Sequence, residues 1–243
     1  DTLEHVILAG FTHEAIVDLS ERLVALAPPG LSKCFYADNG SSGIEVALKM
    51  SLHAWRNLGQ PGKTRFIALE NSYHGETIGA LGVTDIPLFS ETYRPMLQPP
   101  LRAPSPASRL PDEDCVTAAR RAMAAMELLL AEHAHEVAAV IVEPLIQGAA
   151  GMRMYHPIYL TLLREACDRH GVHLIADEIA VGFGRTGTLF ACEQAGITPD
   201  FLVLSKGLTA GYLPMSVVMT HERIYDIFYD RYDTLKGFLH SHS

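Results

Sequence analysis

Two charged residues, Asp177 and Lys206, each stand at the end of a short apolar run that predicts a buried strand. Asp177 ends "VHLIAD", and Lys206 follows "FLVLS". The two runs are successive in the chain, and we expect a helix to join them. In a parallel sheet the carboxyl ends of neighbouring strands open into one crevice, which is where such folds bind ligands. We therefore expect the carboxylate and the amine to share a site.

A carboxylate and a lysine in one crevice are suited to pyridoxal phosphate chemistry. The lysine forms a Schiff base with the aldehyde of this cofactor and can then move a proton as a general base. The aspartate keeps the pyridine nitrogen protonated, so that the ring accepts electrons from the substrate carbon. Taken singly, Asp177 is better interpreted as a turn cap, and Lys206 with Ser205 as a solvated surface pair.

A phosphate anchor is predicted in "YADNGSSGIEVALKM", where Gly40 to Gly43 follow an apolar run and open an amphipathic helix. Free backbone N–H groups, the hydroxyls of Ser41 and Ser42 and the positive helix end all attract anions. A plain capping turn explains the segment on its own. Its combination with Asp177 and Lys206 favours phosphate binding.

A rival interpretation comes from Gly182, Gly184 and Gly187, which spell the dinucleotide-binding pattern G-x-G-x-x-G. In that site the first glycine directly follows a strand, whereas here residues 177–181 intervene. Asp200 has roughly the spacing of the ribose-binding acid but stands before its strand. A nicotinamide-dependent oxidoreductase is therefore disfavoured, and a tight loop is the simpler interpretation.

Apolar runs alternate with helical patterns along the chain, which predicts an α/β fold with a mostly parallel sheet flanked by helices. The predicted strands are "CFYA", "RFIALE", "VAAVIVEP", "VHLIADE", "FLVLS" and "MSVVMT". The predicted helices follow Gly43 and cover 115–134 and 158–171. The proline-rich segment at residues 95–111 is expected to be a long surface excursion.

Composition narrows the class of protein. The chain has 243 residues, 48% of them hydrophobic, and a net charge of -9. This balance suits a globular enzyme and argues against nucleic acid as a partner. No apolar run is long enough to span a membrane. Four cysteines without a C-x-x-C pair predict a reducing, cytoplasmic location. His240 and His242 lack a third ligand, so no metal site is expected.

Five segments in order, "DNGSSGIEVALKM", "NSYHGET", "VIVEPLIQGAAGM", "LIADEIAVGFGRTG" and "LVLSKGLTAGYLP", resemble the class III aminotransferases of the fold-type I pyridoxal phosphate family. The resemblance covers almost the whole chain. It implies that Lys206 is the Schiff-base lysine and contacts substrate, and that Asp177 binds the pyridine nitrogen. It also implies that Gly40 and Ser41 bind the phosphate.

The same resemblance implies further contacts. Tyr73 would stack on one face of the ring and touch substrate, Ile179 would cover the other face, and Glu143 would lie at the edge of the site. Ser241 would lie near substrate, and Ser243 would reach the phosphate of a neighbouring subunit. The expected assembly is a homodimer with shared active sites.

The resemblance also extends to substrates. Segments such as "YHGET" and "FLHSHS" are most similar to members that transfer the amino group of S-adenosylmethionine to 8-amino-7-oxononanoate in biotin synthesis. Residues 1–243 would be the large, cofactor-binding domain, and we expect an N-terminal segment and a C-terminal small domain to be missing. The alternatives are another class III enzyme with an ω-amino acid or diamine donor, and a binding protein that has lost the chemistry.

Overall fold

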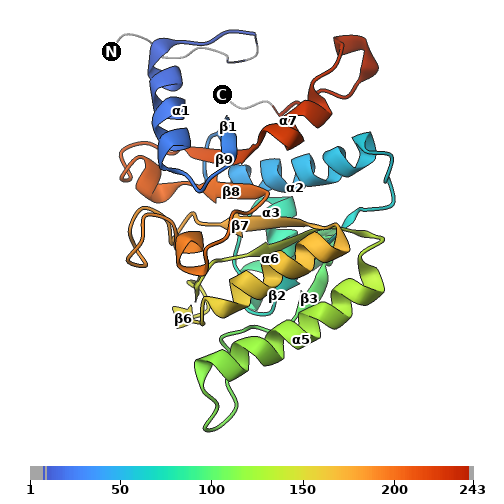
Figure 1. The fold of residues 1–243 in the computed structure, drawn as a ribbon, viewed down its shortest axis with the longest axis vertical. Helices are drawn as coiled ribbons and strands as arrows, with labels where there is room; N and C mark the ends of the chain where they lie inside the picture. Colours follow the sequence, from blue (N-terminus) through green and yellow to red (C-terminus); the bar gives the residue numbers. More distant parts are fainter. Residues whose placement is uncertain (1–7, 9, 241–243) are drawn as a thin grey trace.

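The computed structural model describes residue 8 and residues 10–240, which form a three-layer α/β structure around one main sheet (Figure 1). The seven strands of this sheet have the order β1-β9-β8-β7-β4-β2-β3. Their bounds are β1 Leu31–Ala37, β2 Arg65–Leu69, β3 Leu101–Ala103, β4 Val137–Val142, β7 His173–Asp177, β8 Phe201–Leu204 and β9 Ser216–His221. A short hairpin pairs β5 (Ile146–Gln147) with β6 (Arg153–Met154).

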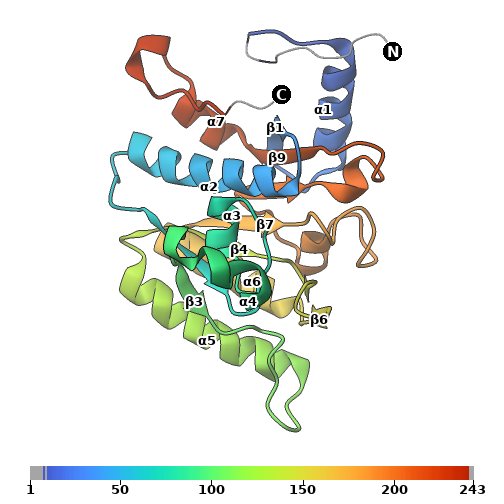
Figure 2. The ribbon, with the colours of Figure 1, turned by 180° about the vertical axis from the view of Figure 1, so that it is seen from behind.

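Helices cover both faces of the sheet, as the two opposite views show (Figures 1 and 2). The α-helices are α1 Glu14–Leu26, α2 Gly40–Asn57, α3 Ile78–Val83, α4 Pro87–Ser90, α5 Cys115–His133, α6 Ile158–His170 and α7 Glu222–Phe228. The 3₁₀ helices are η1 Glu91–Met96, η2 Ala191–Ala195, η3 Lys206–Leu208 and η4 Tyr232–Thr234. Among the described helices, none is long and apolar enough to cross a membrane.

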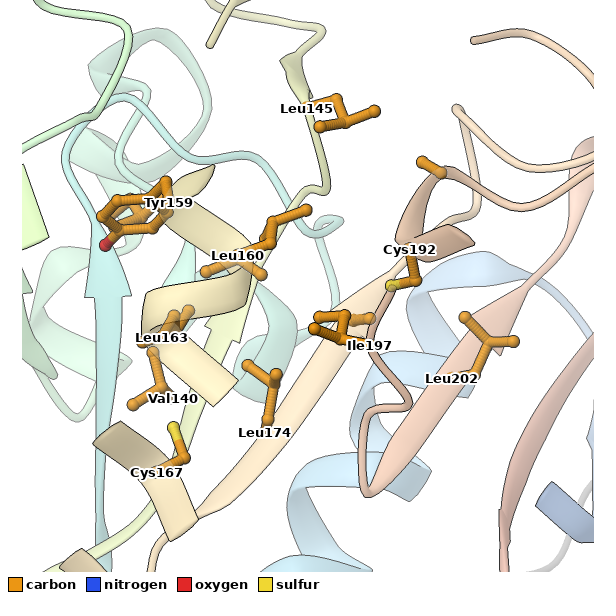
Figure 3. Packing of buried hydrophobic residues seen from close by; sticks show 14 of the residues in the cluster. Val140, Leu145, Tyr159, Leu160, Leu163, Cys167, Leu174, Cys192, Ile197 and Leu202 are labelled. Atoms are coloured by element: carbon orange, nitrogen blue, oxygen red, sulfur yellow. The ribbon is translucent and has the colours of Figure 1, made fainter. Parts of the chain in front are cut away.

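The core has two layers because successive side chains of a strand point to opposite faces. In β8, Leu202 and Leu204 pack on the face that carries α5 and α6, whereas Phe201 and Val203 pack on the face that carries α2. Figure 3 shows the first layer, where Leu160 of α6 lies among strand residues such as Leu174. Every residue of β4 is buried, which explains its uninterrupted apolar run.

The predicted fold class is confirmed. All six predicted strands are present, and of the seven strands in the described sheet β9 alone runs against the others. Helices α2, α5 and α6 lie where the apolar periodicity placed them.

Two details of the prediction are wrong. The proline-rich segment is not only a surface excursion, because its residues Leu101–Ala103 form β3 and pair with β2 at the edge of the sheet. The connection from β7 to β8 holds the 3₁₀ helix η2 and no α-helix. Its glycines explain this, since Gly184 and Gly187 adopt positive φ, which an α-helix excludes.

One edge of the sheet collects the polar residues that follow the parallel strands. The chain leaves this edge after β1, β2, β4, β7 and β8 and enters it again at the start of β9, which is antiparallel. Ligands bind at such carboxyl ends in open α/β sheets. We therefore expect the ligand site at this edge of the sheet.

Candidate active site

A cavity of about 780 Å³ opens at the carboxyl edge of the sheet. A volume of this size is typical of sites for small molecules and cofactors. Its lining includes each of the described residues that the sequence predicted for the site, namely Gly40, Ser41, Tyr73, Glu143, Asp177, Ile179 and Lys206. The structure thus brings together side chains from five separate connections.

The amino end of α2 forms one side of the cavity. Asn39 caps the helix: its side chain accepts the N–H of Ser42 at 3.1 Å, and its carbonyl accepts the N–H of Gly43 at 3.0 Å. The N–H groups of Gly40 and Ser41 have no acceptor within the described residues. Free N–H groups at a helix amino terminus bind anions such as phosphate.

The loop at residues 73–77 docks against this helix end because Gly75 has no side chain. Its φ of +118° favours glycine, and a Cβ here would lie 2.4 Å from Oγ of Ser41. The close approach lets Oγ of Ser41 accept the N–H groups of Glu76 at 3.1 Å and Thr77 at 3.0 Å. The Ser41 hydroxyl is therefore engaged with the loop, and its backbone N–H is the group left for a ligand.

Asp177 is buried at the end of β7, and its two carboxylate oxygens have different partners. Oδ2 lies 2.8 Å from Nδ1 of His74, and Oδ1 accepts the N–H of Ile179 at 3.1 Å. His74 is also buried, and its Nε2 has no hydrogen-bond partner in the described part of the chain. A proton on Nε2 would be an unsatisfied donor, so the arrangement favours a proton on Nδ1 that is donated to Asp177.

Glu143 is a second buried carboxyl group, at the end of β4. Its oxygens accept the N–H of Tyr73 and the N–H of Gly148, each at 3.0 Å. Burial raises the pKa of Glu143 to about 7 and the charge of Asp177 adds to the shift, although the two amides favour the carboxylate. The group can therefore hold or release a proton near neutral pH.

Tyr73 and Ile179 are among the apolar residues that line the cavity. The Tyr73 hydroxyl donates to Oε1 of Glu76 at 2.9 Å, and burial together with Glu76 raises the pKa of Tyr73 to about 12. Ile179 packs on the start of α2, where a Cβ at Gly40 would lie 3.1 Å from its Cδ1. The glycine at position 40 therefore leaves room for Ile179 beside the free N–H groups.

Lys206 follows β8 on the short helix η3, and its backbone has a φ of +42°, in the left-handed region. The residue is exposed, and its amine has no hydrogen bond or ion pair with any described residue. An amine on the wall of a cavity with no partner is free to react. Left-handed backbone at a residue other than glycine carries a conformational cost and is frequent at functional sites.

These residues fit pyridoxal phosphate by their chemistry. Gly40 and Ser41 offer unpaired N–H groups to a phosphate, and Asp177 offers a buried anion to a ring nitrogen. Lys206 offers an unpaired amine to an aldehyde. Among the described residues no three His, Cys, Asp or Glu side chains form a group that could hold a metal.

The sequence profile described as "Aminotransferase class-III" matches residues 1–237. The chain belongs to the class-III aminotransferases. Two adenosylmethionine-8-amino-7-oxononanoate aminotransferases are close relatives. The protein from Helicobacter pylori is 49% identical over 244 residues, and that from Geobacter sulfurreducens is 46% identical over 246 residues. Each alignment covers 100% of this chain and 54% of the relative.

Solved structures of aminotransferases have the same fold. The adenosylmethionine-8-amino-7-oxononanoate aminotransferase of Methanocaldococcus jannaschii superposes with a TM-score of 0.89 at 35% identity, covering 98% of this chain and 53% of that one. An amine transaminase from an uncultivated Pseudomonas species, in a PLP-bound form, gives 0.86 at 34% identity, with coverages of 92% and 51%. This class-III aminotransferase chain spans about half the length of these relatives.

Two of the predicted site residues, Ser241 and Ser243, lie outside the described residues, and so does His242. The roles assigned to the other predicted residues remain predictions. The described ones all line one cavity.

One residue of the site was missed. The family resemblance gave Tyr73 of "NSYHGET" a place in the site but gave no role to His74, the direct partner of Asp177. The signal available was weak, because a histidine next to a tyrosine in a loop does not reveal which of the two turns inward.

The structure does not support a dinucleotide site at the glycine pattern. No described α-helix starts at the glycines 182–187, so there is no helix end for a pyrophosphate. Asp200 accepts hydrogen bonds from the N–H of Leu174 at 2.8 Å, from Arg164 at 2.8 Å and from Arg223. Its carboxylate is therefore fully used within the fold.

Proposed function

We propose that this chain forms the pyridoxal phosphate site of an aminotransferase. The observation that carries the proposal is the meeting of Lys206, Asp177 and the unpaired N–H groups of α2 in one cavity. When bound, the cofactor supplies an aldehyde and an electron-accepting ring. The backbone N–H groups of Gly40 and Ser41 would hold its phosphate.

Side chains of this chain would hold the aldehyde, move the proton, stabilise the ring nitrogen and cover the ring. Nζ of Lys206 would hold the cofactor's aldehyde and, when released, carry a proton to or from the substrate carbon. Asp177, fixed by Nδ1 of His74, would keep a negative charge beside the ring nitrogen. Tyr73 and Ile179 would cover the faces of the ring and exclude water.

We further propose the substrates. The relatives named above at 49% and 46% identity support S-adenosylmethionine as amino donor and 8-amino-7-oxononanoate as acceptor. With these two compounds the full-length protein is expected to release 7,8-diaminononanoate, measured by mass spectrometry. A protein without Lys206 is the negative control.

A second candidate is a class-III enzyme that takes an ω-amino acid or a diamine as donor. The resemblance to the Pseudomonas amine transaminase favours it. The same assay separates the two candidates. Formation of product with a diamine or ω-amino acid, and none with S-adenosylmethionine, would replace the first proposal by the second.

We infer that residues 1–243 form the cofactor-binding large domain of a homodimer. Exposed apolar side chains at and beside the cavity support a partner surface: Met152 and Leu213 line the cavity and are 72% and 64% exposed, and Tyr212, next to Leu213 in the chain, is 89% exposed. Sedimentation of the full-length protein should give the mass of a dimer, and a monomer would contradict the inference.

We also propose a cytoplasmic location. The free state of all four cysteines supports it.

A further inference from the structure

The glycine-rich segment at residues 182–187 lies next to the cavity, yet none of its residues lines it. The proposed function assigns no role to this segment. Its one large apolar residue is Phe183, which is half-buried between Gly182 and Gly184. The packing of this ring connects the segment to the reactive lysine.

Phe183 lies directly against the residue that follows Lys206. A Cβ built at Gly207 would be 2.8 Å from Cδ2 of Phe183 and 2.9 Å from its Cβ. Real side-chain atoms do not approach so closely. The aromatic residue therefore occupies the space that a side chain at position 207 would need, and it touches the backbone of η3.

Phe183 also packs against a buried aromatic residue. Its ring makes an edge contact with Phe190, with centroids 5.7 Å apart, and Phe190 is fully buried. The loop is closed by the N–H of Gly184, which donates to the carbonyl of Leu189 at 3.1 Å. On the other side Gly182 lies against the turn after β7, since a Cβ there would lie 2.9 Å from the carbonyl oxygen of Glu178.

The buried carboxyl group of Glu178 anchors the start of η2, next to Phe190. Glu178, which follows Asp177, is fully buried, and its oxygens accept the N–H groups of Ala191 at 2.7 Å and Cys192 at 2.8 Å. These amides begin η2, directly after Phe190. The position of Phe183 is thus tied to the strand end that carries Asp177.

Lys206 is held on its other side as well. Oγ of Ser205 donates to the carbonyl of Met215 at 2.6 Å, which ties the residue before the lysine to the start of β9. The lysine backbone between these two restraints has its left-handed φ of +42°. Such a conformation persists only when surrounding contacts enforce it.

We propose that Phe183 is a positioning residue for Lys206. It presses on Gly207, keeps the lysine backbone left-handed and so directs Nζ into the cavity. This inference rests on the proposed function, because it concerns the lysine that would bond the cofactor. It gives the glycine pattern a purpose: Gly182 and Gly184 allow the tight loop that places the ring.

The test is the replacement Phe183→Leu in the full-length protein. Nζ of Lys206 adds to the aldehyde of added pyridoxal phosphate, water leaves, and hydride from borohydride reduces the resulting C=N bond to a stable secondary amine. Because misplacement of a reacting group by 1 Å can lower rates about 100-fold, we expect the labelling of Lys206 to slow by about tenfold or more. Peptide mapping measures the label.

Two controls separate positioning from damage to the fold. Phe201→Leu makes the same change in a fully buried ring at the far end of β8, and it should lower the melting temperature without slowing the labelling. Pyridoxamine phosphate has no aldehyde to react with Lys206. Its affinity should therefore be unchanged in Phe183→Leu.

The outcomes are distinct. Unlabelled Lys206 in the unsubstituted protein would overturn the proposed function itself. Normal labelling there and an equal rate in Phe183→Leu would overturn this inference alone. Equal slowing in Phe183→Leu and Phe201→Leu, or a parallel loss of pyridoxamine phosphate affinity, would also overturn it, because the effect would then be general damage.

Discussion

Lys206→Ala is expected to abolish amino transfer, with a loss of at least about 10⁴-fold in turnover, because the variant loses both the covalent link to the cofactor and the group that moves the proton. The fold should be preserved. The side chain of Lys206 is exposed and has no partner among the described residues, so its removal leaves no buried group unpaired. Product formation by mass spectrometry measures the loss.

A matched control is Lys33→Ala, which removes a lysine from a surface ion pair with Glu222 at 3.0 Å. Surface pairs contribute about 0–1 kcal/mol to the free energy of unfolding, so activity and stability should stay close to normal. Borohydride treatment adds a second readout. It should fix the cofactor to the unsubstituted protein and to Lys33→Ala, but not to Lys206→Ala. Label at another lysine, with turnover retained, would refute the assignment.

Asp177→Asn should keep the fold and lose most of the amino transfer. Asparagine has the shape of aspartate and can still accept the N–H of Ile179, while its NH₂ group can donate to Nδ1 of His74 once that ring carries its proton on Nε2. It lacks the charge that holds a proton on the ring nitrogen. The loss of one preorganised electrostatic contact of this kind costs about 100-fold to 1,000-fold in kcat. Near-normal turnover would show that the charge at position 177 is not needed.

Asp200→Asn is the corresponding control, since Asp200 is an equally buried aspartate at the opposite end of the neighbouring strand. It binds Arg164 and Arg223, and breaking a buried ion pair costs up to about 3–5 kcal/mol of unfolding free energy. We therefore expect opposite profiles. Asp200→Asn should lower the melting temperature but keep the turnover of folded protein, and Asp177→Asn should do the reverse.

The strands of the sheet were predictable because their surroundings leave little choice of residue. Val137–Val142 is covered by helices on both faces, so each of its side chains must be apolar, and the run is visible in the sequence. The polar residue after each run was predictable for a related reason. Glu143 and Asp177 stand where a strand leaves the core and the carboxyl edge begins.

Contacts that depend on loop conformation were not predictable. Asn71 has a φ of +61° and Gly75 a φ of +118°, and together these turns decide that His74, and not Tyr73, meets Asp177. A short edge strand such as Leu101–Ala103 is equally hard to recognise, because three residues carry no clear period and prolines surround them. Both features arise from tertiary contacts and leave little local signal.

The antiparallel direction of β9 has a consequence for how this site can change during evolution. A parallel strand would need a crossover that carries the chain away from the cavity, but β9 lets residues 206–215 leave and return at the same edge. The lysine is fixed at the beginning of this loop and Met215 at its end. Residues 209–214 lie between these two fixed points and line part of the cavity, so a change in their length would alter the wall of the cavity without shifting the register of the sheet.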